Sequence, residues 1–370
     1  MTSKERVATA LKHQEPDRVP LMEFAIDYTI IEDLLGHETF WRAHFKEMQA
    51  YWDGRRDEIV ESQKRDIVQF AREFGQDGIA VNLVPPKGFQ PERLQQLDEE
   101  TWRDWQGNVY RYSALTHDLG MIKEKALDAQ PAPDLWEAPA EMDESEWELI
   151  DYVLQELGDT HYIMARPGRR ASLGYVSALG WEPMMMRLAE DPEGVREGRI
   201  RGAQNLDWDI FFDRGCDNLA IGEDFGHNHG PFMSPATFER VYVPSVKIQC
   251  EKIHEHGVQT LWHACGDNRL ILGQMIDAGI DCYQAIQPEE DIVGLRATWG
   301  HRLALWGGIS THTLVSGGPE EIRQQVREAV AGCAPGGGYV AGASHSVCVS
   351  SKAENYLAAI DELSKVGDYR

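Results

Sequence analysis

The chain has 370 residues, of which 42% are hydrophobic and 26% are charged. This composition excludes a disordered chain and predicts either one large α/β barrel or two ordinary domains. Acidic residues outnumber basic ones by 61 to 36, for a net charge of −25. With no stripe of lysine and arginine among aromatic residues, we expect neither a nucleic acid nor an anionic membrane as partner.

No apolar run approaches the ~18 residues of a membrane span. No signal-peptide pattern follows Met1, so we expect a cytoplasmic protein.

The first half of the chain alternates between helical patterns and apolar runs of strand length. A helix is predicted from Ser3 to His13 and a strand from Arg18 to Ile26. Residues 30–75 are mostly helical, and Asp77 to Val84 is a second strand that Pro85 and Pro86 close. Residues 87–140 are less periodic and include a proline-rich connection at 130–133, after which a helix resumes over Glu144 to Leu157.

The second half repeats short apolar runs separated by gaps, several of them long enough for one helix each. These runs are His161 to Ala165, Asn218 to Ile221, Val258 to Trp262, Cys282 to Ile286, Leu303 to Trp306 and Tyr339 to Ala343. Eight candidate strands without a convincing linker predict a single domain over 1–370, a (β/α)8 TIM barrel with extra helices in the N-terminal crossovers. An open, doubly wound sheet is the alternative.

Reactive groups of a parallel barrel lie where its strands end. His263 and Cys265 follow one predicted strand, and their two-residue spacing lets both side chains point the same way. Imidazole and thiolate suit zinc, and a catalytic zinc site takes three protein ligands. Cys348 or His345, after the last strand, is placed to supply the third ligand. His227 and His229 form a competing pair in a glycine-rich loop.

Polar residues at other strand ends are candidates for substrate contacts and proton transfer. Glu223 is the candidate acid/base carboxylate. We expect Asn82, Arg166 and Asp224 to bind substrate. The cluster from Arg166 to Arg170 is either a contact for one anionic small molecule or a solvated loop. All six cysteines should be thiols, and those without a ligand-type neighbour should be buried.

Several motifs together resemble the uroporphyrinogen decarboxylase-like family. They are the N-terminal run from Lys4 to Pro20, Ser234-Pro235, His263-Ala264-Cys265-Gly266, the run from Asp277 to Asp281, Gly307-Gly308-Ile309, Pro335-Gly336-Gly337-Gly338 and Glu354-Asn355. The resemblance spans nearly the whole chain and implies a (β/α)8 barrel, in agreement with the strand count.

The resemblance implies two functional branches. The decarboxylases carry an arginine-rich motif after the first strand that holds substrate propionates, whereas this chain has Glu23 to Tyr28 there, with no arginine. The zinc methyltransferases that act with corrinoid proteins carry His-x-Cys plus a distant cysteine, as His263 and Cys265 do. The distant cysteine of that branch falls nearer to His345, where the decarboxylases place a substrate histidine, than to Cys348. We favour Cys348 because a second thiolate makes a softer zinc site.

The leading interpretation is therefore a zinc-dependent methyltransferase that moves a methyl group between a small methylated substrate or thiol and a corrinoid. The sequence lacks an Asp-x-His-x-x-Gly motif, so the corrinoid (cobalamin) should arrive on a separate protein. The resemblance also implies a homodimer. The alternatives are a metal-free lyase that uses His345 and carboxylates, such as a decarboxylase of a small carboxylic acid, and a barrel retained as a binding subunit.

Overall fold

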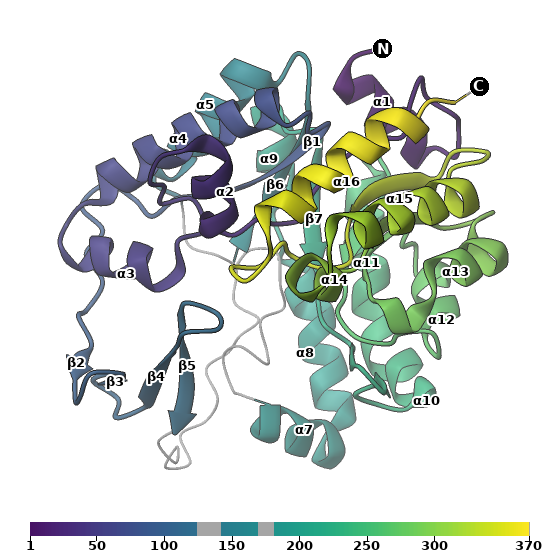
Figure 1. Cartoon of the computed structure of the whole chain (residues 1–370). Coiled ribbons are helices and arrows are strands. Elements are labelled where there is room, and N and C mark those ends of the chain that lie inside the picture. The colour runs from purple at the N-terminus through teal and green to yellow at the C-terminus, as the bar shows by residue number, and fades with distance from the viewer. Residues whose placement is uncertain (124–141, 169–180, 370) are drawn as a thin grey trace.

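Seven parallel strands form one curled sheet in the computed structural model, which describes residues 1–123, 142–168 and 181–369 (Figure 1). The strands are β1 (Gly78–Asn82), β6 (Tyr162–Arg166), β7 (Asn218–Gly222), β10 (Leu261–His263), β11 (Cys282–Ile286), β12 (Ala304–Ile309) and β13 (Tyr339–Ala343), hydrogen-bonded in this order. Each of these strands overlaps a predicted apolar run. The curled parallel sheet is that of a TIM-like barrel.

The segment predicted as the first strand lies between the two edges of this sheet but is not a continuous strand. Leu21 forms a parallel bridge to Ala341 of β13, and Met22 forms one to Gly78 of β1. The Met22 amide donates to the Ala341 carbonyl over 3.0 Å. The Pro20 carbonyl accepts from the Ala341 amide over 2.9 Å, and Ile26 forms a further parallel bridge to Val347.

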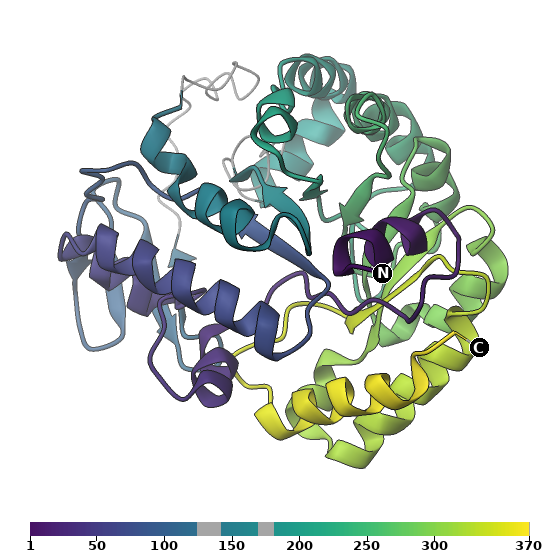
Figure 2. The same ribbon diagram turned by 90° about the horizontal axis from the view of Figure 1, so that it is seen from above.

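One cluster of buried side chains fills the interior of the curled sheet. Its members come from six of the seven strands (β6, β7, β10, β11, β12 and β13), from Met22 and from helix α1 (Ser3–Leu11). They are Val7, Leu11, Met22, Tyr162, Met164, Ala220, Leu261, Cys282, Ala304, Trp306 and Val340, with Phe24 and Ala80 against them. Val7 and Leu11 therefore close one end of the sheet, across which α1 lies in Figure 2.

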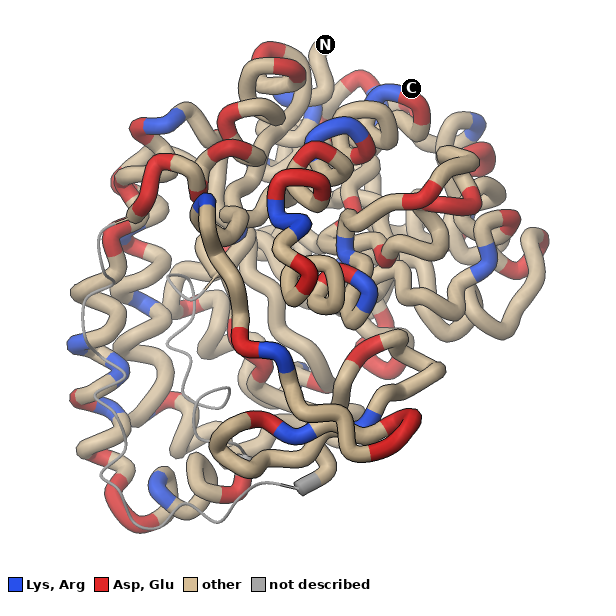
Figure 3. Tube along the Cα trace, turned by 90° about the vertical axis from the view of Figure 1, so that its left-hand side faces the viewer, with Lys and Arg blue, Asp and Glu red and all other residues tan. Residues whose placement is uncertain are grey.

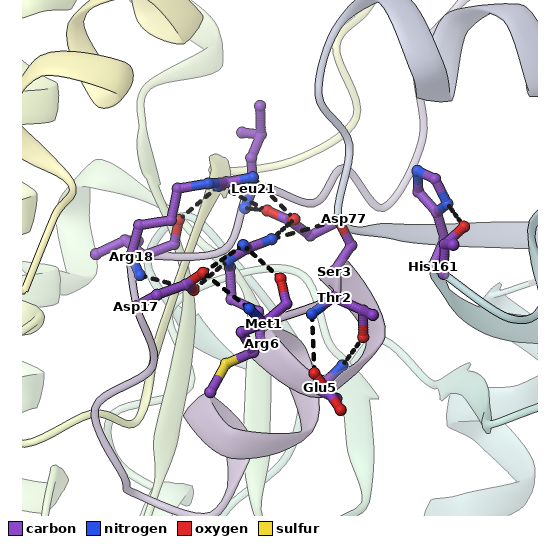
Figure 4. A network of polar contacts seen from close by, with 12 residues as sticks. Met1, Thr2, Ser3, Glu5, Arg6, Asp17, Arg18, Leu21, Asp77 and His161 are labelled. Atoms are coloured by element: carbon purple, nitrogen blue, oxygen red, sulfur yellow. Dashed lines mark hydrogen bonds and ion pairs between the residues drawn. The ribbon is translucent and has the colours of Figure 1, made fainter.

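A buried carboxylate holds this closed end together (Figure 4). Asp77, which has no exposed surface, accepts from Arg6 Nη1 over 2.6 Å and from Arg18 Nη1 over 2.8 Å. It also accepts from the Leu21 amide over 2.8 Å. Since Arg6 belongs to α1 and Asp77 directly precedes β1, the network joins the N-terminal segment to the start of the sheet.

Helices surround the sheet on its outer side (Figure 2). They are α2 (Tyr28–Leu35), α3 (His44–Trp52), α4 (Arg56–Glu73), α5 (Glu148–Leu157), α7 (Trp181–Glu190), α8 (Pro192–Gln204), α9 (Asp209–Arg214), α10 (Pro235–Thr237), α11 (Val243–His254), α12 (Leu272–Asp277), α13 (Ile292–Trp299), α14 (Thr311–Ser316), α15 (Pro319–Cys333) and α16 (Ala353–Val366). Short turns of other helix types cover Glu144–Trp147, Phe238–Tyr242 and Pro288–Glu290. The helices predicted in the first crossover are present as α2, α3 and α4.

The region that we predicted to be less periodic contains a second sheet. Its antiparallel strands are β2 (Gln95–Gln96), β3 (Thr101–Arg103), β4 (Val109–Ser113) and β5 (Asp118–Lys123). This sheet lies away from the curled sheet, beside α3 (Figure 1). Phe45 and Trp52 of α3 pack on Trp102 of β3 in a separate apolar cluster.

The charges of the surface are mixed. On the face drawn in Figure 3, Lys and Arg positions are interspersed with Asp and Glu. Ion pairs also join neighbouring surface helices, as Arg323 does with Asp361 and Arg327 with Glu362. Among the described residues, no helix has both the length and the apolar character needed to cross a bilayer.

Candidate metal centre

Three ligand-type side chains meet at the mouth of the curled sheet. His263 is the last residue of β10, Cys265 lies two residues beyond it, and His345 lies two residues beyond β13. Cys265 Sγ is 3.2 Å from His263 Nε2 and 3.1 Å from His345 Nε2. All three ligand atoms lie within 4.8 Å of one another. The predicted convergence of His263 and Cys265 with a group that follows the last strand is therefore present.

The loop after β10 is held in a shape that points Cys265 toward His263. Gly266 has a φ of +90°, and a Cβ there would lie 2.2 Å from the backbone carbon of Gly226. Only glycine fits such a position without strain. The buried Asn268 amide donates to the carbonyl oxygens of Ala264, Cys265 and Gly266 over 3.0–3.3 Å. These bonds fix the backbone on which the thiol is mounted.

A buried glutamine sets the tautomer of His263. Gln284 Oε1, on the neighbouring strand β11, accepts a hydrogen bond from His263 Nδ1. The Nε2 atom is thereby left as the lone-pair donor that faces Cys265. Burial lowers the pKa of His263 to about 4, so the ring is neutral at pH 7. A β-bulge follows Gln284, and bulges near sites re-aim the side chains beside them.

The three side chains fit a zinc ion. Two neutral imidazole nitrogens and one thiol are ligands that zinc accepts, at 2.0–2.3 Å from the ion. Tetrahedral ligands at those lengths lie roughly 3.5 Å apart, close to the separations seen here. Burial raises the pKa of the Cys265 thiol, so the thiol stays protonated when no cation is nearby. Coordination to a metal ion would release this proton and leave a thiolate ligand.

Cys348, the third ligand that we favoured from the sequence, is not part of this group. Its sulfur contacts Ser351 Oγ at 3.6 Å, and His345 faces Cys265 instead. β13 ends at Ala343, so the side chains after it no longer alternate as in a strand. The conformation of the loop therefore determines that His345, and not Cys348, faces Cys265. His227 and His229 are exposed on a short hairpin formed by β8 (Gly226–His227) and β9 (Gly230–Pro231) and lie outside the group of three.

The two candidate carboxylates after β7, Glu223 and Asp224, have different contacts. Asp224 Oδ1 accepts from the Cys265 amide over 2.9 Å and lies 3.8 Å from His263 Nε2. Glu223 is held by Arg199 of α8 through two bonds of 2.8 and 2.7 Å. The buried Arg199 guanidinium also stacks on the ring of Tyr242 at 4.0 Å. Arg199, which no sequence motif marked, thus fixes the position of Glu223.

Asn82 and Arg166 end the neighbouring strands β1 and β6, where they are paired in register. The Arg166 guanidinium stacks on the ring of Phe24, 3.9 Å from its centroid. The same Phe24 ring stacks on His263, with centroids 4.2 Å apart and planes at 12°. Arg169 and Arg170, the other arginines of the predicted basic cluster, lie outside the described residues.

Sequence reasoning missed Phe24, Gln284 and Arg199. Gln284 carried a signal, since a polar residue inside an otherwise apolar strand is buried only with a partner. Phe24 and Arg199 had none, because their contacts depend on how the sheet curls.

Comparison with known proteins supports the resemblance. Residues 208–366 match the family model of uroporphyrinogen decarboxylase (URO-D), a segment that includes all three residues of the candidate metal centre. The predicted resemblance to the uroporphyrinogen decarboxylase-like superfamily is confirmed over that segment. No curated protein matches the sequence.

One solved structure shares the fold of this chain. A methyltransferase from Methanosarcina mazei aligns with a TM-score of 0.64 over 99% of both chains, at 17% identity. A B12-independent methionine synthase from a Shewanella species aligns with a TM-score of 0.48 over 95% of both chains, at 10% identity. At these identities the likeness to the first structure establishes a common fold.

Proposed function

We propose that this chain is a zinc-dependent methyltransferase that transfers a methyl group between a small methylated substrate or thiol and a corrinoid. The observation that carries the proposal is the convergence of His263, Cys265 and His345, whose ligand atoms lie within 4.8 Å of one another at the mouth of the sheet. Three ligands are what a catalytic zinc site takes from the protein, leaving one coordination position for substrate. The fold shared with a methyltransferase is compatible with this assignment.

In this proposal His345 replaces Cys348 as the third ligand, and the remaining residues position the site. Gln284 keeps the His263 lone pair directed at the metal position, and Asp224 anchors the backbone of Cys265. When bound, zinc supplies Lewis-acid chemistry: it lowers the pKa of an acceptor thiol or polarises the atom that carries the donor's methyl group. Glu223 remains the candidate proton-transfer group, and Asn82, Arg166 and Asp224 remain the candidate substrate contacts.

We also propose that residues 18–26 take the eighth position of a (β/α)8 barrel that comprises the whole chain. The bridges of Leu21 and Met22 to both edge strands support this. A separate protein would present the corrinoid at the mouth that His263, Cys265 and His345 line.

The test combines metal analysis with methyl transfer. The purified protein should hold about one zinc per chain, and His263→Ala, Cys265→Ser and His345→Ala should each lose it. Cys348→Ser is the matched control and should keep it. With zinc bound, the protein should demethylate free methylcobalamin in the presence of 2-mercaptoethanol under anaerobic conditions, which the loss of methylcobalamin absorbance reports. Zinc retained in Cys265→Ser, or no transfer by the loaded protein, contradicts the proposal.

A decarboxylase is the second candidate, because the matching family model is that of uroporphyrinogen decarboxylase. It would use His345 and carboxylates without a metal. Release of CO2 from small carboxylic acids by the metal-free protein, retained in Cys265→Ser, would favour it over the methyltransferase.

A further inference from the structure

Arg166 is partly buried and differs from the buried arginines in how its charge is balanced. Among the described residues, Arg6, Arg56 and Arg199 are buried, and each forms an ion pair with at least one carboxylate. Arg166 forms none with a described carboxylate, and its Nη2 donates to the backbone oxygen of Phe24. Its Nε atom is buried and has no hydrogen-bond partner.

The electrostatic surroundings make this charge more costly still. Burial lowers the pKa of Arg166 to about 9, and the positive charge of Arg42 acts in the same direction. A buried charge without a counterion is strongly destabilising. Such arrangements persist where the missing partner is a ligand.

Arg166 is also placed beside the candidate metal centre. Its guanidinium and the His263 imidazole both stack on the Phe24 ring, at 3.9 Å and 4.2 Å from its centroid. The guanidinium therefore lies no farther from the imidazole than these two distances together. A ligand group bound to Arg166 would lie within the length of a small molecule from the metal position.

The space for such a molecule lies along the ends of β1 and β6. A cavity of about 200 Å³ is lined by Arg42, His44 and Asn82 and by Glu47, a carboxyl group whose pKa burial raises to about 7. It shares Trp41, Arg42, Ala80 and Asn82 with a smaller cavity, of about 20 Å³, that Arg166 and Phe24 line. The smaller cavity has room for a group about the size of a water molecule.

Arg42 brings a second cation to both cavities. Its Nε donates to Asp27 over 2.8 Å, and its side chain remains partly exposed. Its backbone φ is +55°, and that of His44 is +50°, in the left-handed region that costs non-glycine residues energy. The strained loop therefore places both side chains on the cavity wall at an energetic cost.

We propose that the small-molecule substrate carries a carboxylate and that Arg166 binds it, with Arg42 as the second cation. This inference rests on the proposed methyl transfer, in which the rest of the substrate extends past Phe24 to the metal position. A planar carboxylate can accept two parallel hydrogen bonds from a guanidinium. Charge-assisted bonds between guanidinium and carboxylate are among the stronger ones in proteins.

The experiment measures the binding of acetate to the zinc-loaded protein by saturation-transfer NMR. Methanesulfonate and inorganic phosphate are the tetrahedral alternatives, and acetamide is the neutral analogue of acetate. The matched control variant is Arg72→Gln, which replaces an exposed arginine on α4. We expect acetate to bind wild type and Arg72→Gln more tightly than the other three compounds, and Arg166→Gln to lose at least about tenfold of the affinity. Arg166→Lys, which keeps the charge, should retain part of it.

Three results overturn the inference: no acetate binding to wild type, unchanged binding in Arg166→Gln, or equal binding of acetamide. Preference for methanesulfonate or phosphate would overturn the carboxylate assignment while keeping an anion site. Zinc content is measured on the same samples. Loss of acetate binding with zinc retained shows that Arg166 acts on the substrate, whereas absence of zinc from wild type refutes the proposed function independently.

Because the variant removes an unpaired buried charge, Arg166→Gln should fold with a Tm equal to or above that of wild type.

Discussion

The aromatic ring of Phe24 lies parallel to the imidazole of His263, with the centroids 4.2 Å apart and the planes at 12°. The two residues lie far apart in the sequence, and their contact depends on the segment that bridges both edges of the curled sheet. The contact restrains the orientation of a candidate metal ligand.

Replacing Phe24 with leucine should weaken zinc binding by up to about tenfold, because an aromatic pair contributes roughly 0.5–1.5 kcal/mol beyond its buried area. Leucine keeps an apolar side chain in the same place, so the fold should persist. Zinc affinity is measured by competition with a chromophoric chelator. Affinity equal to that of wild type would show that Phe24 contributes packing alone.

Gln284 should control zinc affinity without contacting the metal. Gln284→Leu removes the acceptor for His263 Nδ1 and frees the ring to change tautomer, so we expect a 10–100-fold loss of affinity. Gln284→Glu keeps an acceptor at the same distance and should bind zinc at least as well as the leucine variant. Gln324→Leu, exposed on α15, is the control and should leave the affinity unchanged. Equal affinities of wild type and Gln284→Leu would contradict this assignment.

The strands of the sheet were predictable from the sequence because they are buried on both faces. β6, β11 and β13 are almost entirely buried, and such strands appear as continuous apolar runs. The second sheet was not predictable, because β2 is fully exposed and β4 is mostly half-exposed. Strands of this kind have no apolar run to mark them.

Only the part of the candidate site at the end of a strand was predictable, because there the alternation of side chains shows which residues point the same way. His263 and Cys265 could be paired by their spacing at the end of a strand, whereas the choice between His345 and Cys348 depends on the loop beyond Ser344. Phe24 and Arg199 contact the site through the curl of the sheet and the packing of α8, which no local pattern encodes.

Glu23 should make stability depend on pH. Its side chain is buried, one carboxyl oxygen accepts from the Ala343 amide over 2.9 Å, and the other has no partner. Burial raises the pKa of Glu23 to about 8. Between the unfolded pKa near 4.5 and this value, the folded protein keeps a proton that the unfolded chain releases. This contribution to stability is therefore present below pH 4.5 and is lost as pH rises toward 8.

Glu23→Gln removes this titration, so the variant should gain stability relative to wild type as pH rises from 5 to 8. The relative gain should be at most about 1.4 kcal/mol per pH unit. Urea unfolding at pH 5, 6.5 and 8 measures it. Glu354→Gln, exposed at the start of α16, is the control and should follow wild type. Parallel stability curves for Glu23→Gln and wild type would show that Glu23 is ionised in the folded protein.

Asp77 should be among the most sensitive positions for folding (Figure 4). Asp77→Ala removes the shared acceptor of Arg6, Arg18 and the Leu21 amide and leaves buried donors unpaired. Breaking a buried pair of this kind costs about 3–5 kcal/mol, measured as the free energy of unfolding in urea. Asp361→Ala on α16 breaks exposed pairs with Arg323 and Lys365 and should cost less than about 1 kcal/mol. Equal losses in the two variants would mean that the network does not hold the N-terminal segment to β1, and that the Leu21 and Met22 bridges form without it.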